Sequence, residues 1–387
     1  MVEANHTPSG ENGVAARRLA IEACERIEKD GAYANLLLPK LLAESELDER
    51  DRGFATELVY GSTRMKRSVD YLADRFIDRD DVDSRVRAAL RVGAYQIAFL
   101  RVPAHAAVDA TVAATPKRGR GFVNAVLRKV SAANGADTAW PTEGIELSYP
   151  DWILKRLATD LGDRSVPVLR AMNNAATTHT RDDGYRQDLA SQEVSKLVRD
   201  DGLVLDLCAA PGGKSTFIAG PSSGGGRTVI GSDLHEHRSG LIRAAATDTN
   251  SAVHAVVADA LNAPYRGGQA DAVLVDAPCS GLGSLRRRAD ARWRITPNDV
   301  ENLAGLQFSL VEAAAALVKP GGQVVFSVCT LTKSESVDID ERIAAELPQL
   351  EPEALDDPWE PWGRGGRLLP DTFEGDGMAA FSYRLAH

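Results

Sequence analysis

The sequence predicts an all-α N-terminal domain followed by a doubly wound, mostly parallel α/β sheet. Two observations support this prediction. Residues 14–131 carry apolar side chains at helical spacing almost throughout, and prolines at 103 and 116 separate the stripes. From Leu203 onward, short β-branched runs alternate with helical stretches, which is typical of a parallel sheet covered by helices.

The expected helices follow from their apolar stripes. In residues 14–28, Leu19, Ala23 and Ile27 share one face, and charged residues such as Arg18 lie elsewhere. A strand would need alternating apolar and polar residues, and this region has none of that pattern. Further helices are expected at residues 51–61, 67–76, 84–100, 105–115, 121–131 and, after a polar linker, 149–174.

The expected strands are short and rich in branched residues. A late strand at 377–385 is predicted to pair as a hairpin with 367–369. The remaining strands are expected at 203–207, 228–232, 254–258, 272–275 and 323–328. The predicted domain plan is therefore a disordered N-terminus over 1–13, the all-α domain over 14–135, a connector over 136–187 and the α/β domain over 188–387.

Composition excludes several classes of protein. Hydrophobic residues make up 44% and charged residues 26% of the chain, as in ordinary globular proteins. No stretch reaches the roughly 18 consecutive apolar residues of a membrane span, and the N-terminus lacks the pattern of a secretory signal, so a cytoplasmic protein is expected. The four cysteines form no CxxC pair, so no metal site is expected. With a net charge of −10, RNA would have to be held by local basic patches.

The first motif that points to chemistry is VLDLCAAPGGK, from Val204 to Lys214. A hydrophobic strand ends in an acid, passes through a Pro-Gly-Gly loop and opens a helix. Glycines let the backbone approach a ligand closely. The glycine spacing matches neither a P-loop nor a GxGxxG motif. A lone Gly-Gly pair would more often be a tight turn, but the strand before it favours a ligand-binding loop.

Acidic residues follow three successive expected strands. They are Asp233, Asp259 and Asp276. Each of them alone could be a helix N-cap. Because ligands of open α/β sheets bind at the carboxyl ends of the strands, the three together favour a bound nucleoside cofactor.

Two cysteines fall just beyond neighbouring strands, in DAPCSG and SVCT. Cys279 and Cys329 would each be core filler if considered alone. Their common place beside the expected cofactor loop indicates chemistry. Cys208 is expected to pack and make backbone contacts in the first loop, and Cys24 to lie in the helical core.

Basic residues gather in two segments. The stretch SLRRRADARWR, residues 284–294, directly follows the Cys279 loop and interleaves arginines with a tryptophan. A charge run is usually a solvated face, but arginines beside an aromatic residue also suit phosphate and base contacts. The expected RNA contacts are Arg286, Arg287, Arg288, Arg292, Arg294, Lys117, Arg118 and Arg120.

These motifs carry a family resemblance. DLCAAPGGK, DAPCSG and SVCT resemble, in order and spacing, the Sun/Fmu family of RNA 5-methylcytosine methyltransferases, and GFVNAVLRKV resembles the NusB-like RNA-binding domain in front of that family. The resemblance implies the class I S-adenosylmethionine-dependent methyltransferase fold with a seven-stranded sheet. It implies that S-adenosylmethionine is bound by Cys208, Ala209, Ala210, Pro211, Gly212, Gly213, Lys214, Asp233, Asp259 and Asp276.

The resemblance also implies the reaction. Cys329 would add to carbon 6 of a cytosine, Asp276 would assist at the ring nitrogen, and Cys279 would help to release the product. The target base would have to leave its stack. Two departures stand out: Val328 replaces the usual Thr, and the segment over 175–187 is shorter than the RNA-contacting subdomain of relatives.

Small-subunit ribosomal RNA is the expected substrate, because of the NusB-like domain, and the protein is expected to be a monomer. The alternatives are a transfer RNA cytosine-5 methyltransferase and a noncatalytic RNA-binding or ribosome-assembly protein that retains the fold. The paired thiols of Cys279 and Cys329 count against a noncatalytic protein. A small-molecule methyltransferase is a third alternative, and the helical domain and arginine-rich segment count against it.

Overall fold

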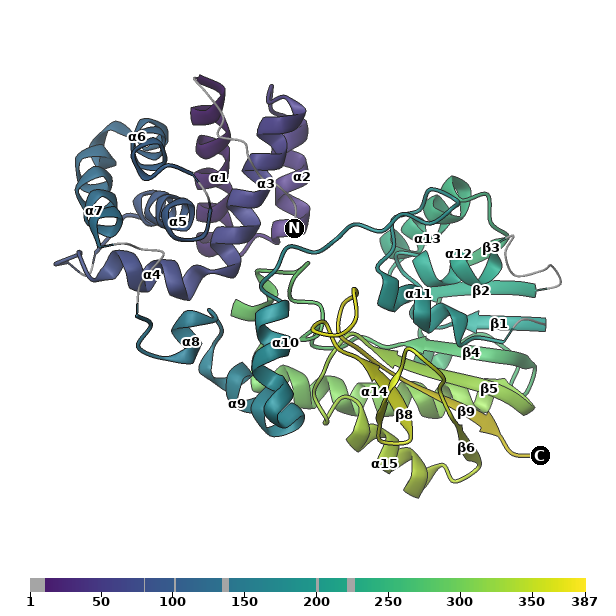
Figure 1. Cartoon of the computed structure of the whole chain (residues 1–387). Helices are drawn as coiled ribbons and strands as arrows, with labels where there is room; N and C mark the ends of the chain where they lie inside the picture. Colours follow the sequence, from purple (N-terminus) through teal and green to yellow (C-terminus); the bar gives the residue numbers. More distant parts are fainter. Residues whose placement is uncertain (1–10, 80, 101, 134–138, 200–201, 221–226) are drawn as a thin grey trace. The chain divides into compact units, whose positions relative to one another are not determined.

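The computed structural model describes residues 11–79, 81–100, 102–133, 139–199, 202–220 and 227–387. The chain forms two compact units. Figure 1 labels the helices and strands of both units. Unit 1 comprises residues 1–154 together with 285–294, and unit 2 comprises 155–284 together with 295–387. The first boundary falls within helix α9 (Asp151–Leu161), later in the chain than the expected end of the all-α domain.

Unit 1 is helical in its described part. Each helix expected over residues 14–131 is present within a few residues of its predicted bounds, and residues 11–13, expected to be disordered, already belong to α1. The helical stretch expected over 149–174 is divided into α9, a 3₁₀ turn η3 (Gly162–Arg164) and α10 (Ser165–Ala171). The expected disorder of residues 1–10 lies outside the described residues. The helices are α1 (Glu11–Lys29), α2 (Ala34–Ala43), α3 (Glu49–Arg64), α4 (Lys66–Asp74), α5 (Ser84–Phe99), α6 (Ala104–Ala114), η1 (Lys117–Gly119), α7 (Arg120–Ala132) and α8 (Glu143–Glu146).

Local sequence explains where these helices begin. The side chain of Asp48 accepts a hydrogen bond from Asp51 N at the start of α3, and Asp83 accepts from two backbone N–H groups at the start of α5. α2 had no separate prediction, because its sequence ANLLLPKLLA is apolar on every face and contains Pro39. Tertiary packing therefore decides its conformation.

A buried polar pair lies inside the core of unit 1. Arg17 is 1% exposed, and its Nε donates to Gln96 Oε1 at 2.8 Å. Burial lowers the pKa of Arg17 to about 10, opposed by the charge of Asp51. The pair ties α1 to α5, and apolar residues of α1, α3, α4, α5 and α7 close around it.

Unit 2 contains the predicted sheet. Its first five strands are β1 (Gly202–Asp206), β2 (Arg227–Asp233), β3 (Val253–Val257), β4 (Ala270–Asp276) and β5 (Val318–Val328). They run parallel in the order β3-β2-β1-β4-β5. Strand order reverses between β1 and β4, and this switch point is where doubly wound sheets bind ligands.

The sheet has nine strands, two more than the seven expected. β9 (Met378–Leu385) pairs antiparallel with β5, and β6 (Leu350–Glu353) pairs with the far edge of β9. β7 (Glu360–Trp362) pairs with β8 (Gly365–Leu368), and β8 forms the predicted hairpin with β9. The two strands that had no prediction are β6 and β7.

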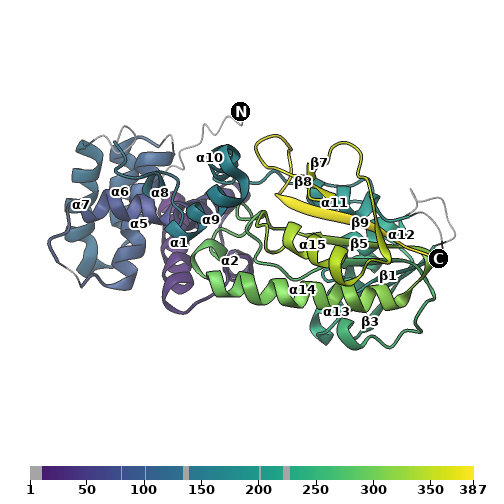
Figure 2. The same cartoon turned by 90° about the horizontal axis from the view of Figure 1, so that it is seen from below.

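Helices cover both faces of this sheet, as Figure 2 shows from below. α14 (Pro297–Leu317) and α15 (Val337–Glu346) pack on the face that carries Val273, Val324 and Phe326. α11 (Leu189–Lys196) and α12 (Gly213–Ala219) pack on the opposite face. Because side chains of a strand alternate between faces, a strand covered on both sides reads as a continuous apolar run.

The core of unit 2 yields a test of this packing. Phe326 is fully buried, and its ring stacks on Phe381 with centroids 5.9 Å apart. Phe326→Ala should lower the free energy of unfolding by about 3–5 kcal/mol. Hydrogen–deuterium exchange of the β5 amides measures this loss for unit 2 alone. The control Leu241→Ala, at a half-exposed position of α13 (Glu236–Asp248), should change the same amides little.

Candidate functional site

The loop between β1 and α12 requires glycine. Gly212 has a backbone φ of +107°, a conformation that side chains rarely adopt. A Cβ atom there would also lie 3.0 Å from Cα of Ile242. The Pro-Gly-Gly pattern therefore fixes a backbone path that brings the chain close to the ends of β1 and β4.

A pocket of about 180 Å³ opens at this switch point. Most of the expected cofactor loop lines it, together with the expected Asp276. Gly212, Asp233 and Asp259 are not among its lining residues. The lining consists of Tyr185, Arg186, Gln187, Asp188, Ser191, Asp206, Cys208, Ala209, Ala210, Pro211, Gly213, Lys214 and Asp276.

Asp206 is a site residue that the sequence analysis did not single out. It ends β1, is fully buried, and accepts a hydrogen bond from Ser215 Oγ at 2.6 Å on Oδ2. Its Oδ1 has no hydrogen-bond partner among the described residues. Burial raises the pKa of Asp206 to about 7, and the hydrogen bond from Ser215 opposes the rise. The signal was present, because this carboxylate ends the strand directly before the glycine loop.

The acids after β2 and β3 are engaged locally. Asp233 Oδ2 lies 3.1 Å from Arg238 Nε, and its Oδ1 accepts from the backbone N–H of His235. Asp259 caps a short 3₁₀ turn, since its Oδ1 accepts from Leu261 N at 3.0 Å. For Asp259 the structure thus shows the capping alternative, and a cofactor contact of either acid stays a prediction.

The short segment before α11 forms one wall of the pocket. It turns back on itself through an antiparallel bridge between Thr180 and Arg186. The guanidinium of Arg181 donates to Gln187 Oε1 and to the carbonyl oxygen of Gly213, both at 2.8 Å, and forms an ion pair with Asp183. This segment therefore holds the start of α12 in place.

The two expected catalytic cysteines lie together. Sγ of Cys279 and Sγ of Cys329 are 3.2 Å apart, and both side chains are half-buried. Ser284 Oγ donates to Cys329 Sγ at 3.8 Å. The pairing of β4 with β5 creates this arrangement, because Asp276 stands beside Ser327 in the parallel register. Cys279 lies three residues after Asp276, and Cys329 lies two residues after Ser327.

The two thiols differ in acidity. The hydrogen bond from Cys279 lowers the pKa of Cys329, against the effect of burial. The same hydrogen bond, reinforced by burial, raises the pKa of Cys279 well above its usual range. Of the pair, Cys329 is therefore the thiol that ionises, and Cys279 the one that keeps its proton.

An ion pair lies beside the cysteines. Lys214 Nζ contacts Asp276 Oδ2 at 2.6 Å, and Ser327 Oγ donates to the other carboxylate oxygen at 2.8 Å. Burial acts to lower the pKa of Lys214, but Asp276 outweighs it and the net shift is upward. The positive charge of Lys214 is also among the influences that lower the pKa of Cys329.

The other two cysteines have different surroundings. Cys208 lies in the glycine loop, where burial and the charge of Asp206 raise its pKa. Cys24 is buried in unit 1, with its Sγ 3.3 Å from Ser62 Oγ. Both placements agree with the sequence-based expectations.

The arginine-rich segment requires a correction. Arg286 and Arg292 are buried within unit 1, at 7% and 0% exposure, and so are not placed to contact RNA as expected. Arg292 donates to the carbonyl oxygens of Arg64 and Ser148, and its guanidinium lies 3.9 Å from the ring centre of Tyr149. These side chains hold a protein segment rather than face solvent.

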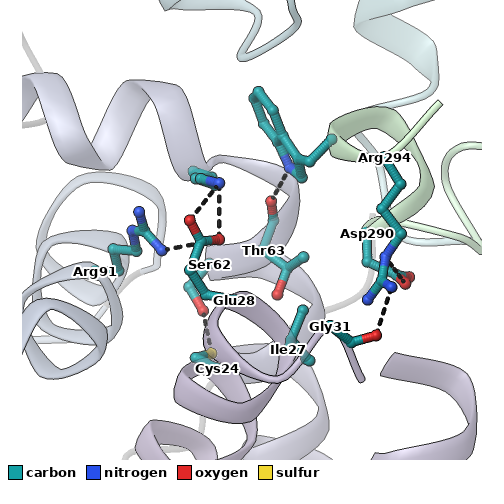
Figure 3. Close-up of a pocket in the computed structure, with 11 residues that line it drawn as sticks. Cys24, Ile27, Glu28, Gly31, Ser62, Thr63, Arg91, Asp290 and Arg294 are labelled. Carbon is teal, nitrogen blue, oxygen red and sulfur yellow. Dashed lines mark hydrogen bonds and ion pairs between the residues drawn. The ribbon is translucent and has the colours of Figure 1, made fainter. Parts of the chain in front are cut away.

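Arg294 also has internal partners. Its NH1 donates to the carbonyl oxygen of Gly31 at 2.6 Å, and its Nε lies 3.2 Å from Asp290 (Figure 3). A pocket of about 220 Å³ adjoins these residues. Charged side chains in its lining are paired with one another; for example, Lys66 Nζ lies 2.8 Å from Glu28 Oε2.

The remaining basic residues are more accessible. Lys117, Arg118 and Arg120 are exposed at η1 and the start of α7, and Arg288 is exposed in the arginine-rich segment. Arg287 is half-buried. These five are the expected RNA contacts that burial leaves available.

Within the described residues, no group of three or more His, Cys, Asp or Glu side chains could hold a metal ion. No described helix is both long enough and apolar enough to cross a membrane.

The corrected role of Arg292 can be tested. Arg292→Ala should lower the free energy of unfolding of unit 1 by about 3 kcal/mol, because it leaves buried carbonyl groups unpaired. The matched control Arg288→Ala, at an exposed position, should cost less than about 0.5 kcal/mol. Hydrogen–deuterium exchange of the α3 and α5 amides measures both values. Equal stability of the two variants would contradict the structural role.

Comparison with known proteins places this site in a family. Residues 196–382 match the model of the 16S rRNA methyltransferase RsmB/F family, and residues 14–132 match the NusB family. The protein PH0851, whose crystal structure is known, is 19% identical and shares the fold with a TM-score of 0.76 over 97% of this chain and 99% of its own.

Curated relatives match over nearly the whole chain. A probable ribosomal RNA small subunit methyltransferase B of Bacillus subtilis is 32% identical, covering 96% of this chain and 98% of the relative. The Thermus thermophilus ribosomal RNA small subunit methyltransferase B is 32% identical, covering 90% and 92%. The first alignment spans 443 residues against 387 in this chain, so that relative carries segments absent here. The chain belongs to the RsmB/F family of ribosomal RNA methyltransferases and carries a NusB-family domain at its N-terminal side.

Proposed function

We propose that this protein uses S-adenosylmethionine to methylate carbon 5 of a cytosine in small-subunit ribosomal RNA. One observation carries the proposal: two thiols of unequal acidity, 3.2 Å apart, lie beside an acid and a pocket at the switch point of the sheet. A methyltransferase that targets an already nucleophilic atom has no need of a thiol. Carbon 5 of cytosine is a poor nucleophile, and a thiolate that adds to the ring activates it.

The pocket residues suit S-adenosylmethionine. Asp206 lines the pocket, and its carboxylate can accept a hydrogen bond from a positively charged amino group. The Cys208–Lys214 loop would lie along the cofactor, and Asp233 would accept from ribose hydroxyls. When bound, the cofactor supplies a methyl group carried on a positively charged sulfur.

Cys329 is proposed as the nucleophile. Its lowered pKa favours the thiolate, which adds to carbon 6 of the cytosine and makes carbon 5 electron-rich. Asp276 would hold a proton at the ring nitrogen, and Lys214 and Ser327 fix the orientation of its carboxylate. The base must be extruded from its stack to reach these groups.

Cys279 is proposed to assist the release of the product. After methylation, water would accept the proton of carbon 5. The electron pair of that C–H bond restores the double bond between carbons 5 and 6 as the bond between Cys329 and carbon 6 breaks. The departing sulfur becomes a thiolate again. Because Cys279 keeps its proton and lies 3.2 Å away, its thiol can donate a hydrogen bond to that sulfur as it leaves.

RNA would be held by basic residues other than the buried arginines Arg286 and Arg292. Lys117, Arg118 and Arg120 form a small exposed basic group on unit 1, and Arg287 and Arg288 are the accessible members of the arginine-rich segment. Contacts of this kind to phosphates are sequence-independent and weaken as salt rises. The choice of the target nucleotide would then depend on the shape of the RNA around an unpaired or easily opened cytosine.

Bisulfite mapping tests the activity and the nucleophile together. Cells that lack the gene should lose methylation at one cytosine of the small-subunit RNA, and the wild-type gene should restore it. Cys329→Ser should leave that cytosine unmethylated, because a serine hydroxyl does not ionise at neutral pH. The control Cys24→Ser should restore methylation. An unchanged map in the deletion strain would exclude this RNA as the substrate.

Replacement of Cys279 tests the release step. Cys279→Ala should accumulate a covalent protein–RNA adduct, since Cys329 still adds to the base but leaves more slowly. The adduct is measured as a denaturation-resistant band that contains RNA. Cys279→Ala/Cys329→Ala should form none. Normal turnover without an adduct in Cys279→Ala would contradict the release role.

A further inference from the structure

Glu335 is a buried carboxylate that the proposed reaction does not use. It lies between β5 and α15 and is 0% exposed. A carboxylate with no access to water needs several hydrogen bonds to remain there. The positions of its partners show what this residue connects.

One set of partners lies in the loop of Cys279. The backbone N–H of Ser280 donates to Glu335 Oε1 at 2.7 Å, and Ser280 Oγ donates to Oε2 at 2.5 Å. Ser280 directly follows Cys279, so these bonds fix the backbone that carries its thiol. Gln307 Nε2 adds a bond to Oε1 at 3.2 Å and another to the carbonyl oxygen of Pro278 at 2.9 Å.

The second set lies in the loop of Cys329. Thr330 Oγ1 donates to Glu335 Oε2 at 3.0 Å, and Thr332 Oγ1 donates to the same oxygen at 2.9 Å. Thr330 directly follows Cys329, and its Oγ1 also lies 3.0 Å from Ser280 Oγ. One carboxylate therefore joins the residues that follow both cysteines.

Within the described residues, every group that donates a hydrogen bond to Glu335 is neutral. Its charge is held by hydrogen bonds rather than cancelled by a cation, and hydrogen bonds to an ionised acceptor are short and strong. The negative charge thus remains close to the thiols while the same group fixes their loops.

We propose that Glu335 is a positioning residue that clamps the two cysteine loops together, setting the contact between the thiols and keeping Cys279 in its uncharged form. Its role in the reaction rests on the proposed function, but its effect on the thiols does not. A glutamate is required because a single side chain must accept from two loops at once and also carry charge.

The charges around the thiols agree with this role. Cys279 faces Cys329, Glu335 and Asp276, and all three act to raise its pKa. Cys329 faces Cys279 and Lys214, which lower its pKa, and Asp276, which raises it. The charge of Glu335 therefore helps to raise the pKa of Cys279, and the charge of Lys214 helps to lower the pKa of Cys329. Removal of the negative charge of Glu335 should therefore bring the pKa values of Cys279 and Cys329 closer together.

Alkylation of the protein without RNA tests the inference. Iodoacetamide reacts with thiolates, and peptide mass spectrometry reads Cys279 and Cys329 separately over a pH series. In the wild type, Cys329 should react at lower pH than Cys279. In Glu335→Gln, the ratio of Cys329 to Cys279 reaction should fall about tenfold, which corresponds to one pKa unit. The control Glu341→Gln, at an exposed position of α15, should match the wild type.

A conservative variant separates charge from geometry. Glu335→Asp keeps the charge but is one methylene shorter, so it cannot reach both loops, and the ratio should fall by less than in Glu335→Gln. A ratio equal to that of the wild type in Glu335→Gln would overturn the inference. If Glu335→Gln does not fold, an unchanged ratio in folded Glu335→Asp overturns it instead.

Methylation assays distinguish this inference from the proposed function. Glu335→Gln should lower kcat and shift its pH profile while KM for RNA stays close to that of the wild type, and Glu335→Asp should recover part of kcat. If the wild type methylates no RNA but the alkylation ratio still falls in Glu335→Gln, the proposed function fails and the clamp stands. If the wild type methylates and Glu335→Gln changes neither kcat nor the ratio, the clamp alone fails.

Discussion

The parallel pairing of β4 with β5 is the constraint on which the site depends. Its register sets Asp276 beside Ser327, so the residues that follow both strands emerge at the same edge of the sheet. Cys279 and Cys329 can meet only because of this register, since a shift of one residue would turn every side chain of a strand to the other face. Apolar residues on both faces of the two strands hold the register. The chemistry thus rests on the packing of the sheet core.

The thiols of Cys279 and Cys329 are chemically identical, but their surroundings give them different pKa values. The hydrogen bond from Cys279 is the main influence that lowers the pKa of Cys329 and raises the pKa of Cys279. Neighbouring charges add to the difference, because Lys214 favours a thiolate at Cys329 and Glu335 opposes one at Cys279. Pairs of titratable groups whose environments separate their pKa values often mark an assignment of roles.

Sequence reasoning succeeded where the signal is local. The strand, glycine loop and helix from Val204 to Lys214 are contiguous, and a motif of that kind fixes its own conformation. The strands β6 and β7 were not predicted, because short strands at a sheet edge have no apolar pattern of their own. Asp206 and Glu335 were missed for another reason: their importance comes from burial, and burial of a charged residue depends on neighbours distant in sequence.

The arginines show the same limit of sequence-based prediction, because the sequence does not reveal which of them are buried. Arg292 and Arg294 each looked available for a phosphate, yet each donates to backbone oxygens nearby. A guanidinium group has five donors in a fixed fork, and backbone carbonyl oxygens can satisfy them when the group is buried. A run of positive charge therefore predicts either a nucleic-acid surface or a tightly bound segment of the protein itself. Exposure decides between the two, and among the expected contacts, all of them described residues, Arg288 and the group around Arg118 are exposed as the proposed RNA contact requires.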